Sequence, residues 1–410
     1  MIMRKVWLLA ASTTLVVSAF AMFGPVLAIL LQQRGYSTTL IGAFAMIPFA
    51  CVALLIPVMP RVFARFGIGR CYLLGLVLET VGTLGYTVSS SFAVWCASAV
   101  AGGMGAAAVW NATEAMLAQY APPDQRGHVM GLYQTALGAA LAAGPFVPAV
   151  LQWQAQTTLV AAALVQFAAL GLTWVSGIAR PQPEATLGNT PGDAIATVGT
   201  GAAPLLNTAA LQANPSRAMG TWQALCAVPY LVGIAFVGGV FEAGLSSISA
   251  ANGANLGLSM AAAASIVGVL GLGSFLFQYP AGMAADRFTP RRVFTVAGGV
   301  LLLSVMLLAW GTQQATPPAK DQLWVLWVSA LVWGGVGGAL YTLTMIRVAH
   351  HFNSPSVAAG TAAMITGYTL GGAIGPVVSG ASLQYMGNLG LSLWLGALAL
   401  AVILLAQRSD

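Results

Sequence analysis

The strongest constraint on how this chain can fold is its succession of apolar stretches, each about as long as a membrane-spanning helix. A bilayer core about 30 Å thick is crossed by a helix of about 20 apolar residues. The 410-residue chain therefore predicts an all-helical protein that crosses the membrane repeatedly. Twelve such stretches cover approximately residues 6–31, 40–59, 71–91, 92–118, 129–151, 157–178, 222–249, 259–285, 293–314, 323–346, 357–384 and 389–406.

The composition excludes several function classes. Charged residues make up 6% of the chain and hydrophobic residues 58%, whereas a soluble domain is about a quarter charged. A soluble enzyme, a nucleic-acid-binding protein and a disordered protein are therefore excluded. The four cysteines form no CxxC pair, and the three histidines (His128, His350 and His351) fall in predicted loops. With no HExxH or GxSxG motif either, we expect no metal, no cofactor and no enzyme activity.

The distribution of basic residues predicts the orientation of the chain. Lys and Arg gather in the cytoplasmic loops of membrane proteins. If both termini are cytoplasmic, only Arg34 and Lys320 fall outside. The net charge of +6 is then a topology signal, which suits a multi-pass protein of a bacterial inner membrane. The other thirteen Lys and Arg residues then lie on the cytoplasmic side: Arg4, Lys5, Arg61, Arg65, Arg70, Arg126, Arg180, Arg217, Arg287, Arg291, Arg292, Arg347 and Arg408.

An internal repeat divides the chain into two parts. Residues 179–221 are rich in Pro, Gly, Thr, Ala and Asn and predict a flexible cytoplasmic linker. We expect six-helix bundles at residues 1–178 and 222–410 on either side of it. Short motifs recur between the two: GGMG at 102–105 as GGVG at 334–337, Arg65-Phe66 as Arg287-Phe288, and Gly144-Pro145 as Gly375-Pro376.

These features resemble the major facilitator superfamily (MFS) over essentially the whole chain. The segment GMAADRFTPRR at 282–292 looks like the family's loop motif GxxxDRxGRR, longer by one residue. The resemblance implies a monomeric rocker-switch transporter of two pseudo-symmetric bundles. The first, fourth, seventh and tenth helices would line a central cavity, and the second, fifth, eighth and eleventh would lie between the bundles. The third, sixth, ninth and twelfth would lie outside.

The loop motifs also predict a gate. We expect the Asp286 carboxylate to accept hydrogen bonds from the first amides of the fifth helix, residues 127–130, because an anion at a helix N-terminus is stabilised by about 0.3–1 kcal/mol. This latch would hold the outward-open state, with Arg287, Arg291 and Arg65 as neighbouring gating charges. The first-half copy of the motif, at 60–70, has Ala64 in place of the acid, so the latch would be asymmetric. The alternative is that these charges only set topology.

Three carboxylates interrupt the apolar stretches, and an acid inside a membrane helix is a functional candidate by default. Glu114 is the first choice, because Trp110 and Asn111 lie one turn away on the same helix face. Glu242 of the seventh helix is the second. Glu79 is on the third helix, which is peripheral in the family arrangement; a structural bond to a neighbouring helix is favoured there over proton coupling.

A second group of side chains on the inner helices could contact a substrate or bond one helix to another. It comprises Tyr133, Gln134, Phe241, Gln278, Tyr341 and Tyr368.

The all-acidic spans favour neutral, amphipathic or cationic solutes. The Gly-Pro pair at 144–145 is similar to an antiporter signature of the family and favours proton-driven efflux of amphipathic or cationic drugs or metabolites. Ala99 stands where the family's proton-coupled drug exporters carry an arginine. This departure keeps open a proton-coupled importer of a small polar nutrient such as a sugar or a siderophore-like solute. The expected partners are a small-molecule substrate, protons and the bilayer, with no nucleic acid.

Overall fold

A computed structural model shows an all-helical molecule in its described residues, 2–120, 126–177, 221–313, 323–352 and 354–408. Ten of its helices are long and apolar enough to cross a membrane, and the protein is a multi-pass membrane protein. A helix satisfies its backbone hydrogen bonds internally, which the bilayer interior requires. The predicted linker at 179–221 lies outside the described residues except for Thr221, and so does Lys320.

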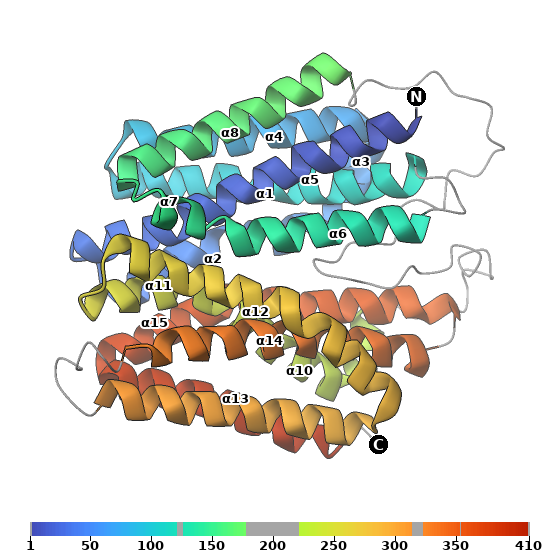
Figure 1. The fold of residues 1–410 in the computed structure, drawn as a ribbon. Coiled ribbons are helices and arrows are strands. Elements are labelled where there is room, and N and C mark those ends of the chain that lie inside the picture. The colour runs from blue at the N-terminus through green and yellow to red at the C-terminus, as the bar shows by residue number, and fades with distance from the viewer. Residues whose placement is uncertain (1, 121–125, 178–220, 314–322, 353, 409–410) are drawn as a thin grey trace.

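The helices form two bundles that lie side by side (Figure 1). Residues 2–177 form the N-terminal bundle and residues 221–408 the C-terminal bundle. The N-terminal bundle comprises α1 (Ile2–Gln33), α2 (Thr38–Leu55), η1 (Ile56–Val58), α3 (Met59–Phe66), α4 (Ile68–Val88), α5 (Phe92–Tyr120), α6 (Arg126–Ala143), α7 (Phe146–Val150) and α8 (Ala155–Ser176). The C-terminal bundle comprises α9 (Thr221–Ala227), α10 (Pro229–Gly239), η4 (Val240–Gly244), α11 (Leu245–Asn255), α12 (Met260–Arg287), α13 (Pro290–Gln313), α14 (Val325–His351) and α15 (Ser354–Ala406).

Two of the expected continuous stretches are interrupted, and two others are joined. The fifth stretch breaks between α6 and α7 at Gly144-Pro145, and the seventh breaks before Pro229, because proline lacks the amide hydrogen that a helix interior needs. Conversely, α15 covers both the eleventh and the twelfth stretches and bends sharply at Gly387, where φ is 62°. Within the described residues, each predicted stretch is largely helical, and the structure has ten helices long and apolar enough to span a membrane where the sequence predicted twelve.

The histidine prediction is wrong in one respect. His350 and His351 lie in the last turn of α14 and His128 in the first turn of α6, so all three are helical and not in loops. The sequence pattern placed them outside because polar residues flank both helices there. Within the described residues, no group of three or more His, Cys, Asp or Glu side chains could hold a metal ion.

The same turn connects the first two long helices of each bundle. Gly35 and Gly257 adopt left-handed conformations, with φ of 80° and 85°, which glycine adopts without steric cost. Two residues later a serine caps the next helix: Ser37 accepts from the Leu40 amide at 3.3 Å and Ser259 from the Ala262 amide at 3.2 Å. The matching turns extend the internal repeat into backbone geometry.

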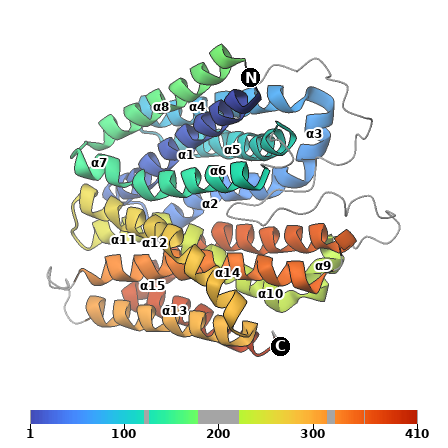
Figure 2. The ribbon, with the colours of Figure 1, turned by 45° about the vertical axis from the view of Figure 1, so that its right-hand side comes forward.

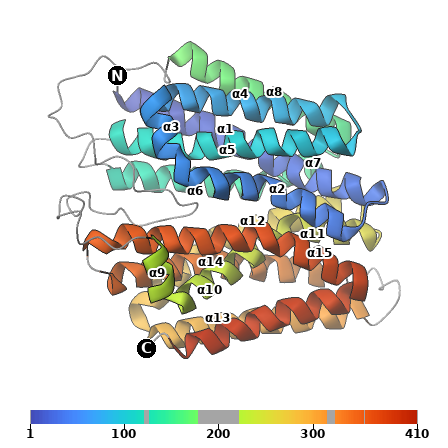
Figure 3. The ribbon, with the colours of Figure 1, turned by 180° about the vertical axis from the view of Figure 1, so that it is seen from behind.

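The bundles contact each other at the end of the molecule opposite the two termini, which we call the far end; the end with both termini is the termini end (Figures 2 and 3). Helix α2 packs against α15, and α6 against α12. Thr38 Oγ1 donates to the Gly380 carbonyl at 2.6 Å, and the Thr39 amide donates to Gln384 Oε1 at 3.3 Å. Gly42 also packs directly on the backbone of Pro376. These close approaches hold the bundles together at the far end.

Candidate functional site

Glu242 joins three helical segments of the C-terminal bundle. It lies in the π-helical segment η4, and such wide turns are frequent at functional sites. Ser274 of α12 donates to Oε1, and the Tyr368 hydroxyl of α15 donates to Oε2 at 2.9 Å. Gly338 of α14 packs against the same carboxylate: a Cβ at Gly338 would lie 2.9 Å from Oε1. Both carboxylate oxygens thus accept hydrogen bonds from the protein, the strong type in which one partner is charged.

Glu114 is the first-choice acid of the N-terminal bundle. It is buried on α5 and interacts electrostatically with Tyr133 of α6 and with Tyr341 of α14. Tyr341 belongs to the other bundle and interacts in the same way with Glu242. Its ring lies 4.7 Å from that of Tyr368, centroid to centroid, at an interplanar angle of 50°. Contacts between side chains therefore connect Tyr341 to Glu242 through Tyr368 inside the C-terminal bundle, and the charge of Glu114 acts on Tyr341 from the other bundle.

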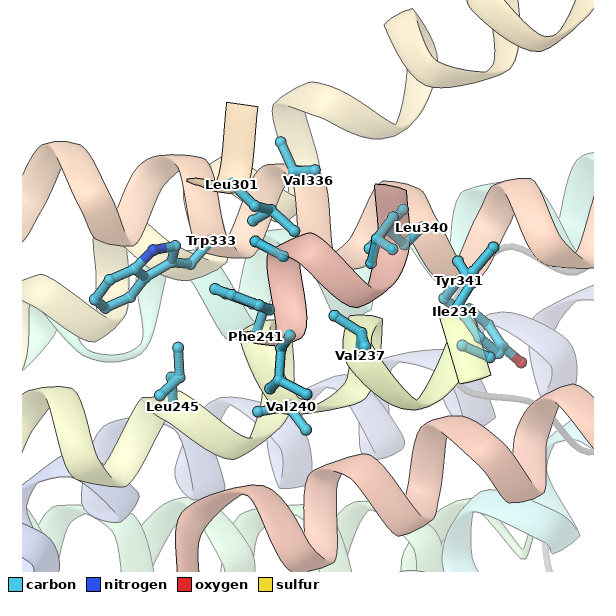
Figure 4. Packing of buried hydrophobic residues seen from close by; sticks show 14 of the residues in the cluster. Ile234, Val237, Val240, Phe241, Leu245, Leu301, Trp333, Val336, Leu340 and Tyr341 are labelled. Carbon is cyan, nitrogen blue, oxygen red and sulfur yellow. The ribbon is translucent and has the colours of Figure 1, made fainter. Parts of the chain in front are cut away.

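Two buried tyrosine hydroxyls, one in each bundle, have no hydrogen-bond partner among the described residues. Tyr133 is 1% exposed and Tyr341 is 2% exposed, and neither Oη makes a hydrogen bond there. Figure 4 shows Tyr341 at the edge of the hydrophobic core with its hydroxyl directed away from Phe241 and Trp333. Leaving a buried polar group unsatisfied costs about 1–3 kcal/mol. Such groups are positions where a ligand atom would complete the hydrogen bonding.

Glu79 contacts a different set of side chains. It is buried between α4 and α8, where Gln166 Nε2 donates to its Oε2 at 3.2 Å. Gly105 of α5 packs against its side chain, since a Cβ there would lie 2.7 Å from Glu79 Cγ. All of these contacts are within the N-terminal bundle, so the geometry favours the structural interpretation of this acid over a transport role.

The remaining predicted contact residues occupy varied environments. Trp110, Gln134 and Gln278 are half-buried. Asn111 Nδ2 donates to the Ala107 carbonyl of its own helix at 2.7 Å. Phe241 is fully buried and packs on Trp333, with ring centroids 6.4 Å apart (Figure 4). Phe241 therefore supports the core behind Glu242, and we leave it out of the proposed substrate site.

The predicted gating residues lie at the termini end. Asp286, Arg287, Arg291 and Arg65 are all exposed. Asp286 lines a cavity of about 260 Å³ with Arg347 and His350 at the adjoining ends of α12 and α14. Within the described residues, no hydrogen bond or ion pair holds the Asp286 carboxylate, so the expected bond to the start of α6 is not formed in this arrangement.

Comparison with known proteins identifies the family. The model of the Major Facilitator Superfamily matches residues 9–271 and 231–408. The chain belongs to the Major Facilitator Superfamily. Among curated MFS relatives, the uncharacterised MFS-type transporter YcaD of Shigella flexneri serotype 5b is 23% identical over 99% of this chain and 96% of its own length. YcaD of Escherichia coli O7:K1 is 24% identical over the same shares.

Solved MFS structures share the fold. The nucleoside transporter NupG superposes with a TM-score of 0.73 at 11% identity, covering 98% of both chains. A bacterial homologue of the human lysosomal transporter Spinster, in an inward-facing and unoccupied conformation, gives 0.70 at 16% identity, covering 100% of this chain and 93% of its own. At these identities the likeness establishes the MFS architecture only.

Two partners of the acids were missed in the sequence. The sequence could have identified Gln166 as a polar partner, because it is a lone amide in an otherwise apolar part of its helix. Ser274 was not, because serines are common in membrane helices and nothing in the sequence sets this one apart. Pairing it with Glu242 requires the packing of α12 against η4.

Proposed function

We propose that the protein is a proton-coupled secondary transporter that exports amphipathic or cationic solutes by alternating access. The observation that carries this proposal is the pair of membrane-embedded acids, Glu114 on α5 of the N-terminal bundle and Glu242 on η4 of the C-terminal bundle. Lys and Arg of the described helices lie near helix ends, so the middle of the membrane holds only negative ionisable groups. A cation is the solute that such a site stabilises.

We infer the cellular arrangement from the basic residues. Both termini face the cytoplasm of a bacterial inner membrane, which the enterobacterial origin of the relatives supports. The far end then faces outside, and the α2–α15 contacts close the site toward that side. The bundles at 1–178 and 222–410 rock against each other about the site, connected by the linker at 179–221. The transporter works as a monomer.

Proton exchange supplies the energy in this scheme. A carboxylate that binds a cation in one state and a proton in another couples the two flows in opposite directions. Moving one charge through 100 mV is worth about 2.3 kcal/mol. In this scheme Glu114 serves as the substrate acid, and Glu242, whose oxygens accept hydrogen bonds from Ser274 and Tyr368, serves as the proton-binding acid.

Binding and flux measurements test the proposal. Purified protein is screened by thermal shift at two pH values against lipophilic cations, antibiotics, sugars and siderophores. A ligand at a hundred times its dissociation constant stabilises the folded protein by about 2.7 kcal/mol. Export requires stabilisation by cations, stronger at high pH, and pH-driven cation flux in proteoliposomes that Glu114→Gln and Glu242→Gln abolish. Stabilisation by one polar nutrient, stronger at low pH, would instead establish the importer.

A further inference from the structure

One continuous segment of the C-terminal bundle connects Glu242 to the contact between the bundles. Helix α11 follows directly after η4 and packs against α1 of the N-terminal bundle. Ala250 of α11 is fully buried in one cluster with Ile29 of α1, and Gln32 Nε2 donates to Asn255 Oδ1 at 3.4 Å at the far end. A change in the turn that holds Glu242 would therefore displace a helix that helps to close the far end.

The turn itself holds one residue more than the same length of α-helix. A π turn is such an insertion, and here it covers Val240–Gly244. Each residue of an α-helix adds a rotation of about 100° and a rise of about 1.5 Å. If the turn changed to the α form with α10 fixed, α11 would rotate and shift by about these amounts. That rotation would turn Asn255 away from Gln32.

The contacts on either side of the turn determine which helix can move. Before the turn, Gly239 packs directly on the α15 backbone, because a Cβ there would lie 2.9 Å from the carbonyl carbon of Tyr368. After the turn, the nearest atom to a Cβ at Gly244 would be Pro376 Cδ, at 3.2 Å. The backbone contact leaves α10 no room to rotate, so a change in the turn displaces α11.

We propose that η4 is a switch that couples the hydrogen bonding of Glu242 to the closure of the far end. While Ser274 and Tyr368 donate to the carboxylate, the turn stays in the π form and α11 lies against α1. When these bonds are lost, the turn relaxes to the α form and α11 releases α1. This inference rests on the proposed function, in which Glu242 binds and releases a proton, and adds how that change reaches the far end.

Two reporter cysteines test the switch in the ligand-free protein, each in a background without the four native cysteines. One replaces Ala254 of α11 and is alkylated from the far side; the other replaces Val232 of α10 and is alkylated from the termini side. Ser274→Ala and Tyr368→Phe each remove one donor to Glu242. Each should speed labelling at Ala254 by up to about tenfold, the effect of one hydrogen bond to a charged group, and leave labelling at Val232 unchanged.

Thr366→Val is the matched control on α15, because the Thr366 hydroxyl donates to the Ala362 carbonyl of its own helix at 2.8 Å. It should change neither reporter. Unchanged labelling at Ala254 in both Ser274→Ala and Tyr368→Phe would overturn the inference, and so would an equal rise at Ala254 and Val232, which indicates general loosening of the bundle. The proposed function would stand in either case, since the labelling uses neither substrate nor a pH gradient.

Deletion of Ala243 tests the inserted residue directly. Without it the turn closes as an α-helix while α11 keeps its present phase, so the far end should stay closed. In this background Tyr368→Phe should no longer speed labelling at Ala254. The same rise with and without the deletion would overturn the switch. If the deletion variant does not fold, the two reporters in the point variants decide the question.

Discussion

At the scale of single residues, the surroundings of each acid define its chemistry. Glu79, Glu114 and Glu242 interrupt apolar helices in the same way, yet their partners differ. Glu79 accepts from one amide inside the N-terminal bundle, and Glu242 accepts from two hydroxyls on two other helices. Glu114 interacts with tyrosines of both bundles. We propose transport roles for Glu114 and Glu242 and a structural role for Glu79, so substitutions at these three positions should have separable effects.

Replacing Glu242 with Gln tests its role directly. The amide nitrogen of Gln cannot accept a hydrogen bond, so either Ser274 or Tyr368 loses its acceptor, at a cost of about 1–3 kcal/mol. We expect pH-driven flux in proteoliposomes to fall to background, because Gln binds no proton. Glu79→Gln is the matched control: its remaining oxygen still accepts from Gln166, and flux should stay near wild type. Equal loss of flux in both variants would contradict the assignment.

The sequence predicted the candidate acids of the site but not how they are connected. Hydropathy alone singles out Glu79, Glu114 and Glu242, because a carboxylate stands out in an apolar helix. Which hydroxyls reach them depends on helix rotation and on the π-helical turn at Val240–Gly244, neither of which leaves a local pattern. Phe241 illustrates the limit: it is adjacent to Glu242 in sequence, yet it faces the core at Trp333.

At the scale of helices, glycines determine how closely neighbouring elements pack around the site. Gly338 of α14 contacts both members of the Ser274–Glu242 pair: a Cβ there would lie 2.8 Å from Ser274 Oγ and 2.9 Å from Glu242 Oε1. Small residues at such crossings let membrane helices approach closely. In the GGVG repeat, the last glycine, Gly337, packs against the backbone of η4, and Gly338 directly after it packs against the acid.

A single methyl group at Gly338 should therefore impair the site. Gly338→Ala must displace Ser274 or Glu242, since separations under 3.0 Å are not tolerated, and overpacking typically costs about 1–3 kcal/mol. We expect a lower melting temperature and reduced proton-driven flux. Gly299→Ala on α13 is the control, because a Cβ there meets nothing within 4 Å; it should leave both measurements unchanged. Wild-type behaviour of Gly338→Ala would mean that the carboxylate cluster is looser than described.

At the scale of the whole molecule, the twelve apolar stretches and the motif resemblance were sufficient to predict the fold. The alternating-access state was not predictable, since both states of a rocking transporter bury the same sequence patterns. It is set by contacts between distant segments, such as Thr38 with Gly380, that involve ordinary residues. Whether Asp286 is bonded or exposed could not be predicted for the same reason, because we expect the start of α6 to reach it only when the bundles close at the termini end.

Asp286→Asn tests that latch. Without the charge, the state closed at the termini end loses an anion at a helix N-terminus, about 0.3–1 kcal/mol, and the population should shift toward the arrangement seen here. The measurement is alkylation of a reporter cysteine at Gln278, in a background without the four native cysteines, from the termini side. Faster labelling is expected. Ala64→Asp, which restores the missing acid of the first copy, should slow it, and unchanged labelling in both variants would refute the latch.

Crowding the contact between α2 and α15 at the far end should shift the population in the opposite direction, toward the state that is closed at the termini end. In the present arrangement a Cβ at Gly42 would lie 2.6 Å from the carbonyl carbon of Pro376 and 2.9 Å from the amide nitrogen of Val377. Backbone cannot yield as a flexible side chain does, so Gly42→Leu fits only if α2 and α15 separate. The same reporter should then label more slowly from the termini side and faster from the far side. Gly171→Leu on α8, where a Cβ meets nothing within 4 Å, controls for added bulk.

Combining Gly42→Leu with Asp286→Asn should return labelling toward wild type, because the first weakens the closure at the far end and the second weakens the closure at the termini end. If the double variant labels like Gly42→Leu alone, the two ends are not opposing gates of one rocking motion.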